Sequence, residues 1–325
     1  MENELVRVSV IVPLFNEEKF IEKCLQSLIA QTYPKEKMEW ILVDGASTDR
    51  TVEIIKSHLN DGPIVLLNNE KRKTPYALNM GIEQAKGEYI IRLDAHSSFP
   101  PEYIEKCVHY LDTTDADNVG GVAETESKGY IGEAISQMLS TKFGVGNSQF
   151  RTNGESGYVD TVPFGAFRRE VFDKVGLFNP KLLRSEDNDM NARIRAAGGK
   201  VWLAQDIRFK YYCRDTVGGL LKMGMQNGNA LFRTLKENPK AMSLRHFIPF
   251  LFVASLLVLI VGSIFLPIAR WALLAEASLY GLLDVYFSFG KCKVKYAITA
   301  IWLYPLFHIC YGLGSLLGMI GIKLY

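Results

Sequence analysis

The sequence predicts an α/β fold, with a mostly parallel, Rossmann-like sheet and flanking helices, followed by C-terminal transmembrane helices. From Val8 to about Ile207, short β-branched runs alternate with helical patterns, which is typical of βαβ units. Beyond His246 the chain carries long stretches with few charges, which is typical of helices that cross a bilayer. Together these observations divide the chain into a water-facing part and a membrane part.

Five apolar runs are the expected strands: Val8–Val12, Trp40–Val43, Ile64–Leu67, Tyr89–Leu93 and Val119–Val122. Between the first two, the apolar residues of segment 17–31 recur at helical spacing, which predicts a crossover helix with one buried face. Because such crossovers are right-handed, the carboxyl ends of the parallel strands gather at one edge of the sheet. We expect the functional loops at that edge.

The composition gives no reason to expect nucleic acid as a partner or secretion of the first domain. The 325 residues carry a net charge of only +2. The five cysteines are scattered without a C-x-x-C pair, which predicts reduced thiols, no disulfide and no zinc site. The apolar run that ends at Pro13 is too short for a signal peptide. The first domain is therefore expected in the cytoplasm.

Three C-terminal stretches are candidate transmembrane helices: 247–269, 271–290 and 296–322. The first has no charge over about 23 residues, or roughly 34 Å of helix, which exceeds a hydrocarbon core of about 30 Å. The second contains Glu276 and Asp284, which are costly in lipid unless they face a partner or water. The third is uncharged and carries Gly314 and Gly318 in a G-x-x-x-G spacing that permits close helix contact.

Basic clusters precede the first and third stretches: Lys236, Lys240 and Arg245, then Lys291, Lys293 and Lys295. By the positive-inside rule both clusters are cytoplasmic. Three spans would then place Tyr325 outside, in a multi-pass protein of the cell inner (plasma) membrane. The expected domains are the α/β domain 1–212, an amphipathic interfacial segment 213–245 and the membrane domain 246–325. The alternative for the last is a buried helical subdomain of a soluble protein.

A carboxylate stands at the end of the second expected strand. Asp44 follows Val43 and is placed to accept a hydrogen bond from a base N–H or a ribose hydroxyl. Ser47 and Asp49 are simpler caps for the helix expected at 51–59.

A second carboxylate, Asp94, ends the strand at 89–93. Hard oxygen ligands such as Asp suit Mg²⁺ or Mn²⁺, and a nucleotide diphosphate needs a divalent cation to neutralise the charge of the leaving group. His96, two residues further, can point the same way and would favour Mn²⁺. The alternative for His96 is a surface histidine bonded to the backbone.

Four motifs follow one another along the chain: V-P-L-F-N-E-E from 12, V-D-G-A-S-T-D-R-T from 43, A-L-N-M-G-I-E-Q-A-K-G-E-Y-I-I-R-L-D-A-H from 77 and S-E-D-N-D-M-N-A-R from 185. Together they resemble glycosyltransferase family 2, the inverting enzymes of the GT-A fold, over about residues 7–235. The D-A-H variant resembles the succinoglycan-type exopolysaccharide transferases. The resemblance implies donor-site roles for Pro13, Asn16, Glu17, Asp44, Asn79 and Asp94. It also implies that Asp94 and His96 occupy the metal-binding D-x-D position.

An inverting transfer is a single displacement, so a carboxylate must take the proton of the acceptor hydroxyl. Asp187 shares one side of a predicted helix with Met190, and a carboxylate turned inward there is either a cap or a site residue. Ser185 is the simpler cap. The family's catalytic aspartate is the second residue of the E-D pair, so the resemblance implies Asp187 as the base. The resemblance also places Glu186 on the acceptor side, together with Gly165 in the stretch V-P-F-G-A-F.

Processive family members usually carry Q-x-x-R-W, but residues 226–230 read Q-N-G-N-A. We therefore expect addition of one sugar from a nucleotide-sugar donor, a UDP-sugar, to a polyprenyl-linked glycan acceptor. Membrane lipid is a further expected partner. Such a step belongs to exopolysaccharide or cell-surface polysaccharide biosynthesis. One alternative is a polyprenyl-phosphate sugar synthase, which shares every motif. Another is a non-catalytic membrane scaffold, which would predict loss of Asp94 or Asp187.

Overall fold

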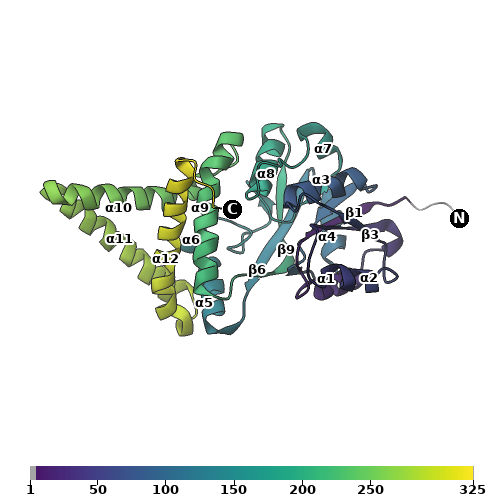
Figure 1. Ribbon diagram of the computed structural model, residues 1–325, viewed down its shortest axis with the longest axis horizontal. Coiled ribbons are helices and arrows are strands. Elements are labelled where there is room, and N and C mark those ends of the chain that lie inside the picture. The colour runs from purple at the N-terminus through teal and green to yellow at the C-terminus, as the bar shows by residue number, and fades with distance from the viewer. Residues whose placement is uncertain (1–4, 325) are drawn as a thin grey trace. The chain divides into compact units, whose positions relative to one another are not determined.

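The structure, a computed structural model, describes residues 5–324, and their packing divides the chain into two units. The first comprises the chain up to Glu124 together with Asn153–Tyr211. The second comprises Thr125–Thr152 and the chain from Tyr212 onward. Each unit is described by itself below (Figure 1).

Within residues 5–324 a nine-stranded mixed sheet is present, in the order β3-β2-β1-β4-β8-β6-β9-β5, with β7 paired to β9. Its strands are β1 Val8–Leu14, β2 Met38–Asp44, β3 Ile64–Asn68, β4 Tyr89–Arg92, β5 Ser97–Ser98, β6 Asn118–Glu126, β7 Gly157–Tyr158, β8 Ala166–Arg168 and β9 Val201–Tyr212. The first four strands in this order are mutually parallel, and β8 is antiparallel to both β4 and β6. All five predicted strands are confirmed.

The first unit has helices between its strands: α1 Ile21–Ile29, α2 Thr51–Ser57, α3 Thr74–Gln84, α4 Tyr103–Thr113, α7 Glu170–Val175 and α8 Glu186–Ala196, with a 3₁₀ turn η1 at Lys35–Lys37. The predicted apolar face of α1 is buried through Ile21, Cys24, Leu25 and Leu28. Helix α3 packs closely on β1, because a Cβ atom at Gly81 would lie 2.5 Å from the Ile11 side chain. Because β1, β2 and β4 are parallel, their carboxyl ends lie at one edge of the sheet, as predicted.

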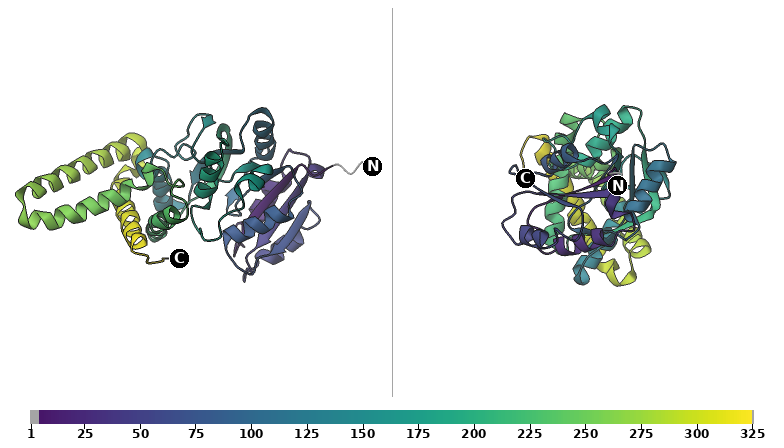
Figure 2. Two further views of the ribbon diagram at one scale, coloured as in Figure 1. Left: turned by 90° about the horizontal axis from the view of Figure 1, so that it is seen from above. Right: turned by 90° about the vertical axis from the view of Figure 1, so that its right-hand side faces the viewer.

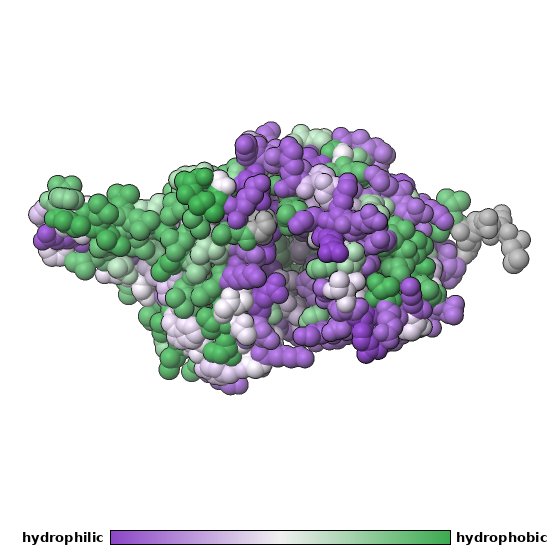
Figure 3. Space-filling model, in the orientation of Figure 1, coloured by the Kyte–Doolittle hydropathy of each residue, from purple (hydrophilic) through white to green (hydrophobic). Residues whose placement is uncertain are grey.

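The second unit is helical: α5 Gly129–Leu139, α6 Lys142–Val145, α9 Val217–Glu237, η2 Leu244–His246, α10 Ile248–Phe265, α11 Pro267–Lys291 and α12 Val294–Met319. Three helical stretches, Leu244–Phe265, Pro267–Lys291 and Val294–Met319, are long and apolar enough to cross a membrane. In this unit α10 and α11 form a hairpin that projects from the other helices (Figures 1 and 2). Hydrophobic residues make up most of the face of the hairpin that Figure 3 shows.

Segment 125–152 was expected inside the first domain, but it packs with the C-terminal helices. Its apolar residues Ala134, Ile135, Met138 and Leu139 share a buried cluster with residues of α9 and α12, including Leu220, Leu303, Tyr304 and Phe307. Local periodicity shows that α5 has an apolar face, but the partners of that face, in α9 and α12, lie far away along the chain.

The predicted glycine contact is confirmed, and its partner is α9. A Cβ atom at Gly314 would lie 2.1 Å from the Met225 carbonyl oxygen, and one at Gly318 would lie 2.4 Å from that of Asn229. A side chain at either position would therefore separate α12 from α9. The side-chain amide of Asn229 also donates to the Gly314 carbonyl at 3.3 Å.

Candidate active site

The carboxyl ends of β1 and β2 are joined by reciprocal hydrogen bonds between their loops. The Asn16 amide donates to Ser47 Oγ at 2.8 Å, and Asn16 Oδ1 accepts from the Thr48 amide at 2.8 Å. The Glu17 amide donates to Thr51 Oγ1 at 2.7 Å. Asn16 adopts a left-handed conformation, with φ of 55°, which asparagine tolerates better than most residues. The two loops therefore form one rigid rim at the edge of the sheet.

Asp44 lies beneath this rim and has one free carboxylate oxygen. In β2 it pairs with Leu14 of β1, so it lies beside Pro13 and the start of the Asn16 loop. Its Oδ2 atom accepts from the Ser47 amide at 3.0 Å, whereas its buried Oδ1 atom has no partner among residues 5–324. A buried carboxylate oxygen without a partner is costly unless a ligand supplies a donor.

The capping predictions for this loop are half right. The Asp49 carboxylate accepts from the amide of Thr51, the first residue of α2, at 3.0 Å. Ser47 does not cap α2; its hydroxyl accepts from Asn16 and so joins the two loops.

Arg92, the last residue of β4, lies at the centre of an acidic group. Its side chain is 6% exposed and forms ion pairs with Asp94 at 3.4 Å, with Glu186 at 3.1 Å and with Asp187. Burial by itself would lower the pKa of Arg92, and the three carboxylates more than reverse this effect, so its guanidinium stays charged. One cation thus holds together the end of β4 and the start of α8.

Asp187 combines burial with partial solvent access. Burial raises the pKa of its carboxyl well above the ordinary value; Arg92 opposes this shift, and the neighbouring carboxylates of Glu186 and Asp94 add to it. Its side chain is still 29% exposed, so a reactant can approach it. A carboxylate of raised pKa that remains accessible suits a general base better than a fully solvated one does.

His96 is held between two carboxylates. Its Nδ1 atom lies 3.3 Å from Glu17 Oε1, and its Nε2 atom lies 4.0 Å from Asp94 Oδ2. Glu17 therefore orients the imidazole so that the other ring nitrogen faces Asp94. No group of three or more His, Cys, Asp or Glu side chains that could hold a metal ion occurs within the described chain, 5–324.

A buried amide network positions α8, which carries Glu186 and Asp187. Asn118 of β6 donates to Asn191 Oδ1 at 2.6 Å, and Asn191 donates in turn to Thr161 Oγ1 at 2.9 Å. Asn118 and Asn191 are both almost fully buried, so these bonds are shielded from water. They fix the helix against the centre of the sheet.

Ser185 does not cap α8, contrary to the sequence expectation. It has a left-handed φ of 63°, and its side chain makes no cap bond to the helix. Asp189 is buried and pairs with Arg193 at 3.0 Å, and Arg193 also donates to the carbonyl oxygens of Val175, Gly176 and Leu177. Asp189 therefore has a structural role, on a different side of the helix from Asp187.

Two residues implied by the resemblance have structural partners instead of open surfaces. Asn79 donates to the Phe178 carbonyl and accepts from the Phe178 amide, each at 2.9 Å, so its amide group ties α3 to the loop after α7. Gly165 is buried, and a Cβ atom there would lie 2.3 Å from Asn118 Oδ1. Interior packing is sufficient to require this glycine.

Arg92 is a candidate site residue that sequence reasoning missed, although it lies within the motif R-L-D-A-H. The signal was a charged residue inside an otherwise apolar strand. A buried charge needs partners, but its partners Glu186 and Asp187 come from a distant helix that the sequence does not place beside it.

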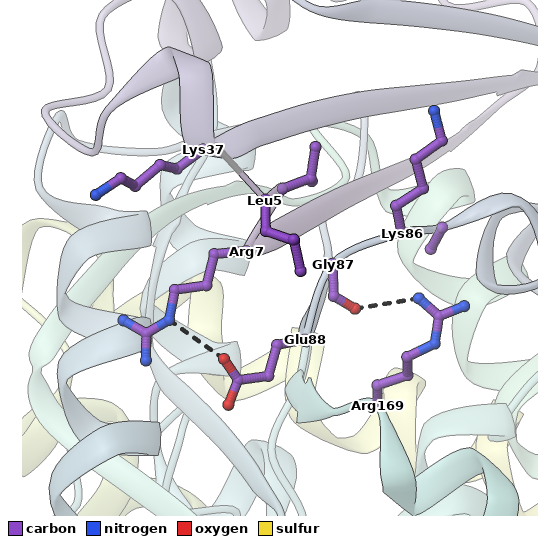
Figure 4. A pocket seen from close by; sticks show the side chains of 9 residues that line it. Leu5, Arg7, Lys37, Lys86, Gly87, Glu88 and Arg169 are labelled. Atoms are coloured by element: carbon purple, nitrogen blue, oxygen red, sulfur yellow. Dashed lines mark hydrogen bonds and ion pairs between the residues drawn. The ribbon is translucent and has the colours of Figure 1, made fainter. Parts of the chain in front are cut away.

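A basic pocket of about 790 Å³ lies at the opposite end of the strands from this site (Figure 4). Its lining includes Arg7 before β1, Lys37 before β2, Lys86 and Glu88 before β4, and Arg169 directly after β8. Arg7 is paired with Glu88 at 3.3 Å, and Arg169 donates to the Gly87 carbonyl at 3.2 Å. The carboxylates described above are all at the other edge, so this pocket takes no part in their chemistry.

The chain is similar to proteins of known families. The model described as Glycosyl transferase family 2 matches residues 9–176. A dolichyl N-acetyl-alpha-D-glucosaminyl phosphate 3-beta-D-2,3-diacetamido-2,3-dideoxy-beta-D-glucuronosyltransferase of Methanococcus voltae is 29% identical over 83% of this chain and 86% of its own. The succinoglycan biosynthesis protein ExoA of Rhizobium meliloti is 26% identical over 81% of this chain and 82% of its own.

Solved structures show the same fold. A mannosyltransferase of Pyrobaculum calidifontis, in complex with GDP-Man and Mn²⁺, matches with a TM-score of 0.64 at 20% identity, over 95% of this chain and 87% of its own. Staphylococcus aureus TarS 1-349, in complex with UDP-GlcNAc, matches with a TM-score of 0.51 at 16% identity, over 98% and 93%. The GT-A fold and the resemblance to succinoglycan-type transferases are confirmed. The chain belongs to glycosyl transferase family 2 and is a glycosyltransferase.

Proposed function

We propose that this enzyme transfers one sugar, with inversion, from a nucleotide-sugar donor to a lipid-linked glycan acceptor. The observation that carries the proposal is the position of Arg92 between Asp94 and the pair Glu186 and Asp187. A direct displacement needs a carboxylate for the cation on the donor side of the reacting carbon and a base on its acceptor side. Arg92 holds carboxylates suited to these two tasks within reach of one guanidinium.

The donor nucleotide is assigned to the rim above Asp44. The free Oδ1 atom of Asp44 accepts a hydrogen bond from the base or ribose, while Pro13, Asn16 and Glu17 shape the wall around it. The solved neighbours hold GDP-Man or UDP-GlcNAc. For this chain we propose a UDP-sugar.

A divalent cation, Mg²⁺ or Mn²⁺, fits Asp94 and His96. Their facing atoms are 4.0 Å apart, a separation that two ligands of one cation can adopt, and Glu17 orients the imidazole as a carboxylate commonly does for metal-bound histidine. Phosphate oxygens and water would complete the coordination, since Asp94 and His96 supply two ligands. When bound, the cation neutralises charge on the departing diphosphate.

Asp187 is assigned as the base that takes the proton of the acceptor hydroxyl. Its raised pKa makes it a stronger base than a solvated aspartate, and Arg92 keeps it ionised by favouring the negative form. Glu186, on the same side of Arg92, is assigned to the acceptor. Both residues lie at the start of α8, which the buried Asn118–Asn191 bond holds in place.

The acceptor is proposed to be polyprenyl-linked, in exopolysaccharide or cell-surface polysaccharide assembly at the cell inner membrane. The relative from M. voltae is named for a dolichyl phosphate-linked sugar acceptor, and that from R. meliloti for succinoglycan biosynthesis. We assign catalysis to residues 1–212 on the cytoplasmic side, lipid contact to the interfacial segment 213–245 and anchoring to 246–325.

The test is release of nucleotide by the purified full chain from a panel of UDP-, GDP- and dTDP-sugars, with and without a polyprenyl-diphosphate-linked saccharide. We expect one donor to be consumed, with release that depends on the acceptor. Equal release with polyprenyl phosphate alone would contradict the proposed acceptor. The absence of release from every donor would contradict the assignment of the donor site.

A further inference from the structure

We propose that only α10 and α11 cross the membrane, as a hairpin, and that α12 lies in the plane of the membrane surface. In this arrangement one face of α12 contacts lipid, and the segment after α12 stays on the same side as the catalytic unit. Length and composition alone permit a third span here. The packing of the second unit favours two.

The first half of α12 is bound to segment 125–152. Tyr296 Oη donates to the Glu133 carboxylate, Tyr304 Oη shares a hydrogen bond of 2.8 Å with Thr141, and His308 Nε2 lies 3.0 Å from the Phe143 carbonyl oxygen. These contacts extend from residue 296 to 308, which is about 18 Å of helix. The first half of α12 must therefore lie at the same depth relative to the membrane as segment 125–152.

Segment 125–152 belongs in water, or at most at the membrane surface. Both of its ends continue directly into the first unit, at Glu124 and Asn153. Its exposed residues include Lys128, Glu133 and Lys142. A charged side chain at the centre of a bilayer is costly, and three would have to enter together. We infer that α12 lies outside the hydrocarbon centre along its first half.

Helix α9 places the same constraint on the second half of α12. The two helices run side by side at glycine contacts, from Gly224 against Phe307 to Gly318 against Asn229. If α12 crossed the bilayer, α9 would have to cross with it. Helix α9 carries Lys222, Arg233 and Lys236, with Lys222 and Lys236 exposed, which suits a surface position.

The exposed face of α12 is an apolar stripe: Val294, Ile298, Trp302, Leu306, Ile309 and Leu313. These residues follow one another at intervals of three or four, so they share one side of the helix, and the opposite side is buried in protein. Only one side of α12 is therefore open to lipid, as expected of a helix lying in the interface.

The hairpin has the dimensions and charges of two spans. Its helical arms, Leu244–Phe265 and Pro267–Lys291, have 22 and 25 residues, or roughly 33 and 37 Å, which is sufficient for a hydrocarbon core of about 30 Å. Basic residues lie at both roots (Lys240 and Arg245; Lys291, Lys293 and Lys295), and the tip holds only Arg270. Both roots are therefore placed on the cytoplasmic side, against anionic headgroups.

The views agree with this arrangement. The hairpin points away from α9 and α12, which run side by side across its root (Figures 1 and 2). The contacts of α12 with α10 at Gly312 are made by Pro249 and Val253, in the first two turns of α10.

The test is the depth of spin labels on the full chain in vesicles of phosphatidylethanolamine and phosphatidylglycerol. Single cysteines replace Ile298, Leu306 or Leu313 on α12, and Leu257 on α10 serves as the deep reference. The partly exposed Cys213 and Cys310 are first changed to Ser, while the three buried cysteines stay. Each variant is retained only if it still releases nucleotide from the donor.

We expect the three α12 labels to lie at one shallow depth, as judged from accessibility to oxygen and to a nickel chelate, and the Leu257 label to lie deep. A spanning α12 would give a deep label at 306 between shallower labels at 298 and 313, and this result would overturn the proposal. Epitope tags give a second readout. When a protease is added outside the vesicles, a tag after residue 325 and an N-terminal tag should be either both protected or both cleaved. Protection of one tag and cleavage of the other would also overturn the proposal.

Discussion

Arg92 and Asp187 form a direct ion pair although 95 positions separate them in the chain. Arg92 ends a central strand, and Asp187 lies in the first turn of α8. The pair joins the donor-side motif to the acceptor-side motif. It also gives the site its most direct tests.

Replacing Arg92 with Met should reduce turnover and move the acid limb of the pH–rate profile to higher pH. Arg92 favours the ionised form of Asp187, so its loss lets burial raise the pKa of that carboxyl further. A base of higher pKa stays protonated up to a higher pH, so activity is lost first on the acid side. The measurement is kcat/KM against pH.

The matched control for this variant is Arg208→Met, which removes an exposed pair with Glu124. Exposed pairs contribute about 0–1 kcal/mol, so the pH profile of the control should be unchanged. An Arg92→Met profile of normal shape, reduced only in height, would show that Arg92 does not influence the base.

Replacing Asp187 with Asn should reduce kcat by about 10²- to 10⁴-fold, the usual cost of losing a general base. The change is nearly isosteric, so donor affinity and folding should persist. Asp189→Asn is the control, because it disturbs the buried ion pair with Arg193. This variant should lower the midpoint of thermal unfolding and leave kcat much less affected than Asp187→Asn does. If Asp189→Asn or Glu186→Gln were inactive while Asp187→Asn worked, the base would have to be reassigned.

Replacing Glu17 with Gln should weaken cation binding without removing a ligand. Glu17 lies 3.3 Å from His96 Nδ1, and loss of such an orienting carboxylate typically costs about 10- to 100-fold in metal affinity. The measurement is the Mn²⁺ concentration that restores half of maximal activity after chelation. Glu18→Gln is the control, because the side chain of Glu18 accepts a hydrogen bond from the Arg50 amide at 3.3 Å.

Two further variants test the cation site itself. Asp94→Asn should abolish turnover, and His96→Gln should raise the Mn²⁺ requirement at least as much as Glu17→Gln does. Full activity of Asp94→Asn in the presence of a chelator would exclude the site.

His58 should make stability depend on pH. Its ring lies 2.6 Å from Asp61 and 3.0 Å from Glu22, and these carboxylates raise the pKa of His58. A group of raised pKa stabilises the fold fully below its unfolded pKa of about 6.5, and this contribution disappears as the pH rises through the folded pKa. The unfolding midpoint of His58→Gln should therefore fall below that of the wild type at acidic pH and approach it at alkaline pH. The comparison variant is His109→Gln, which changes an exposed histidine on α4.

Strands, helices and membrane segments could be predicted because their signals are local. The apolar runs of β1 to β4 and β6, the buried face of α1 and the long uncharged helices each lie within one window of sequence. The order of the motifs identified the family for the same reason. Asp44 and Asp94 could be placed at strand ends because parallel strands share one edge.

The tertiary structure alone decided which distant residues meet. The partners of Arg92, the exchange of hydrogen bonds between the Asn16 and Ser47 loops, and the packing of 125–152 on α12 all join segments that no periodicity connects. A buried charge or an apolar face in the sequence indicates that a partner is needed, but it does not indicate where in the chain that partner lies. For α12 this difference matters most, because its composition permits a span, whereas its contacts with segment 125–152 and α9 carry the proposal of a surface position.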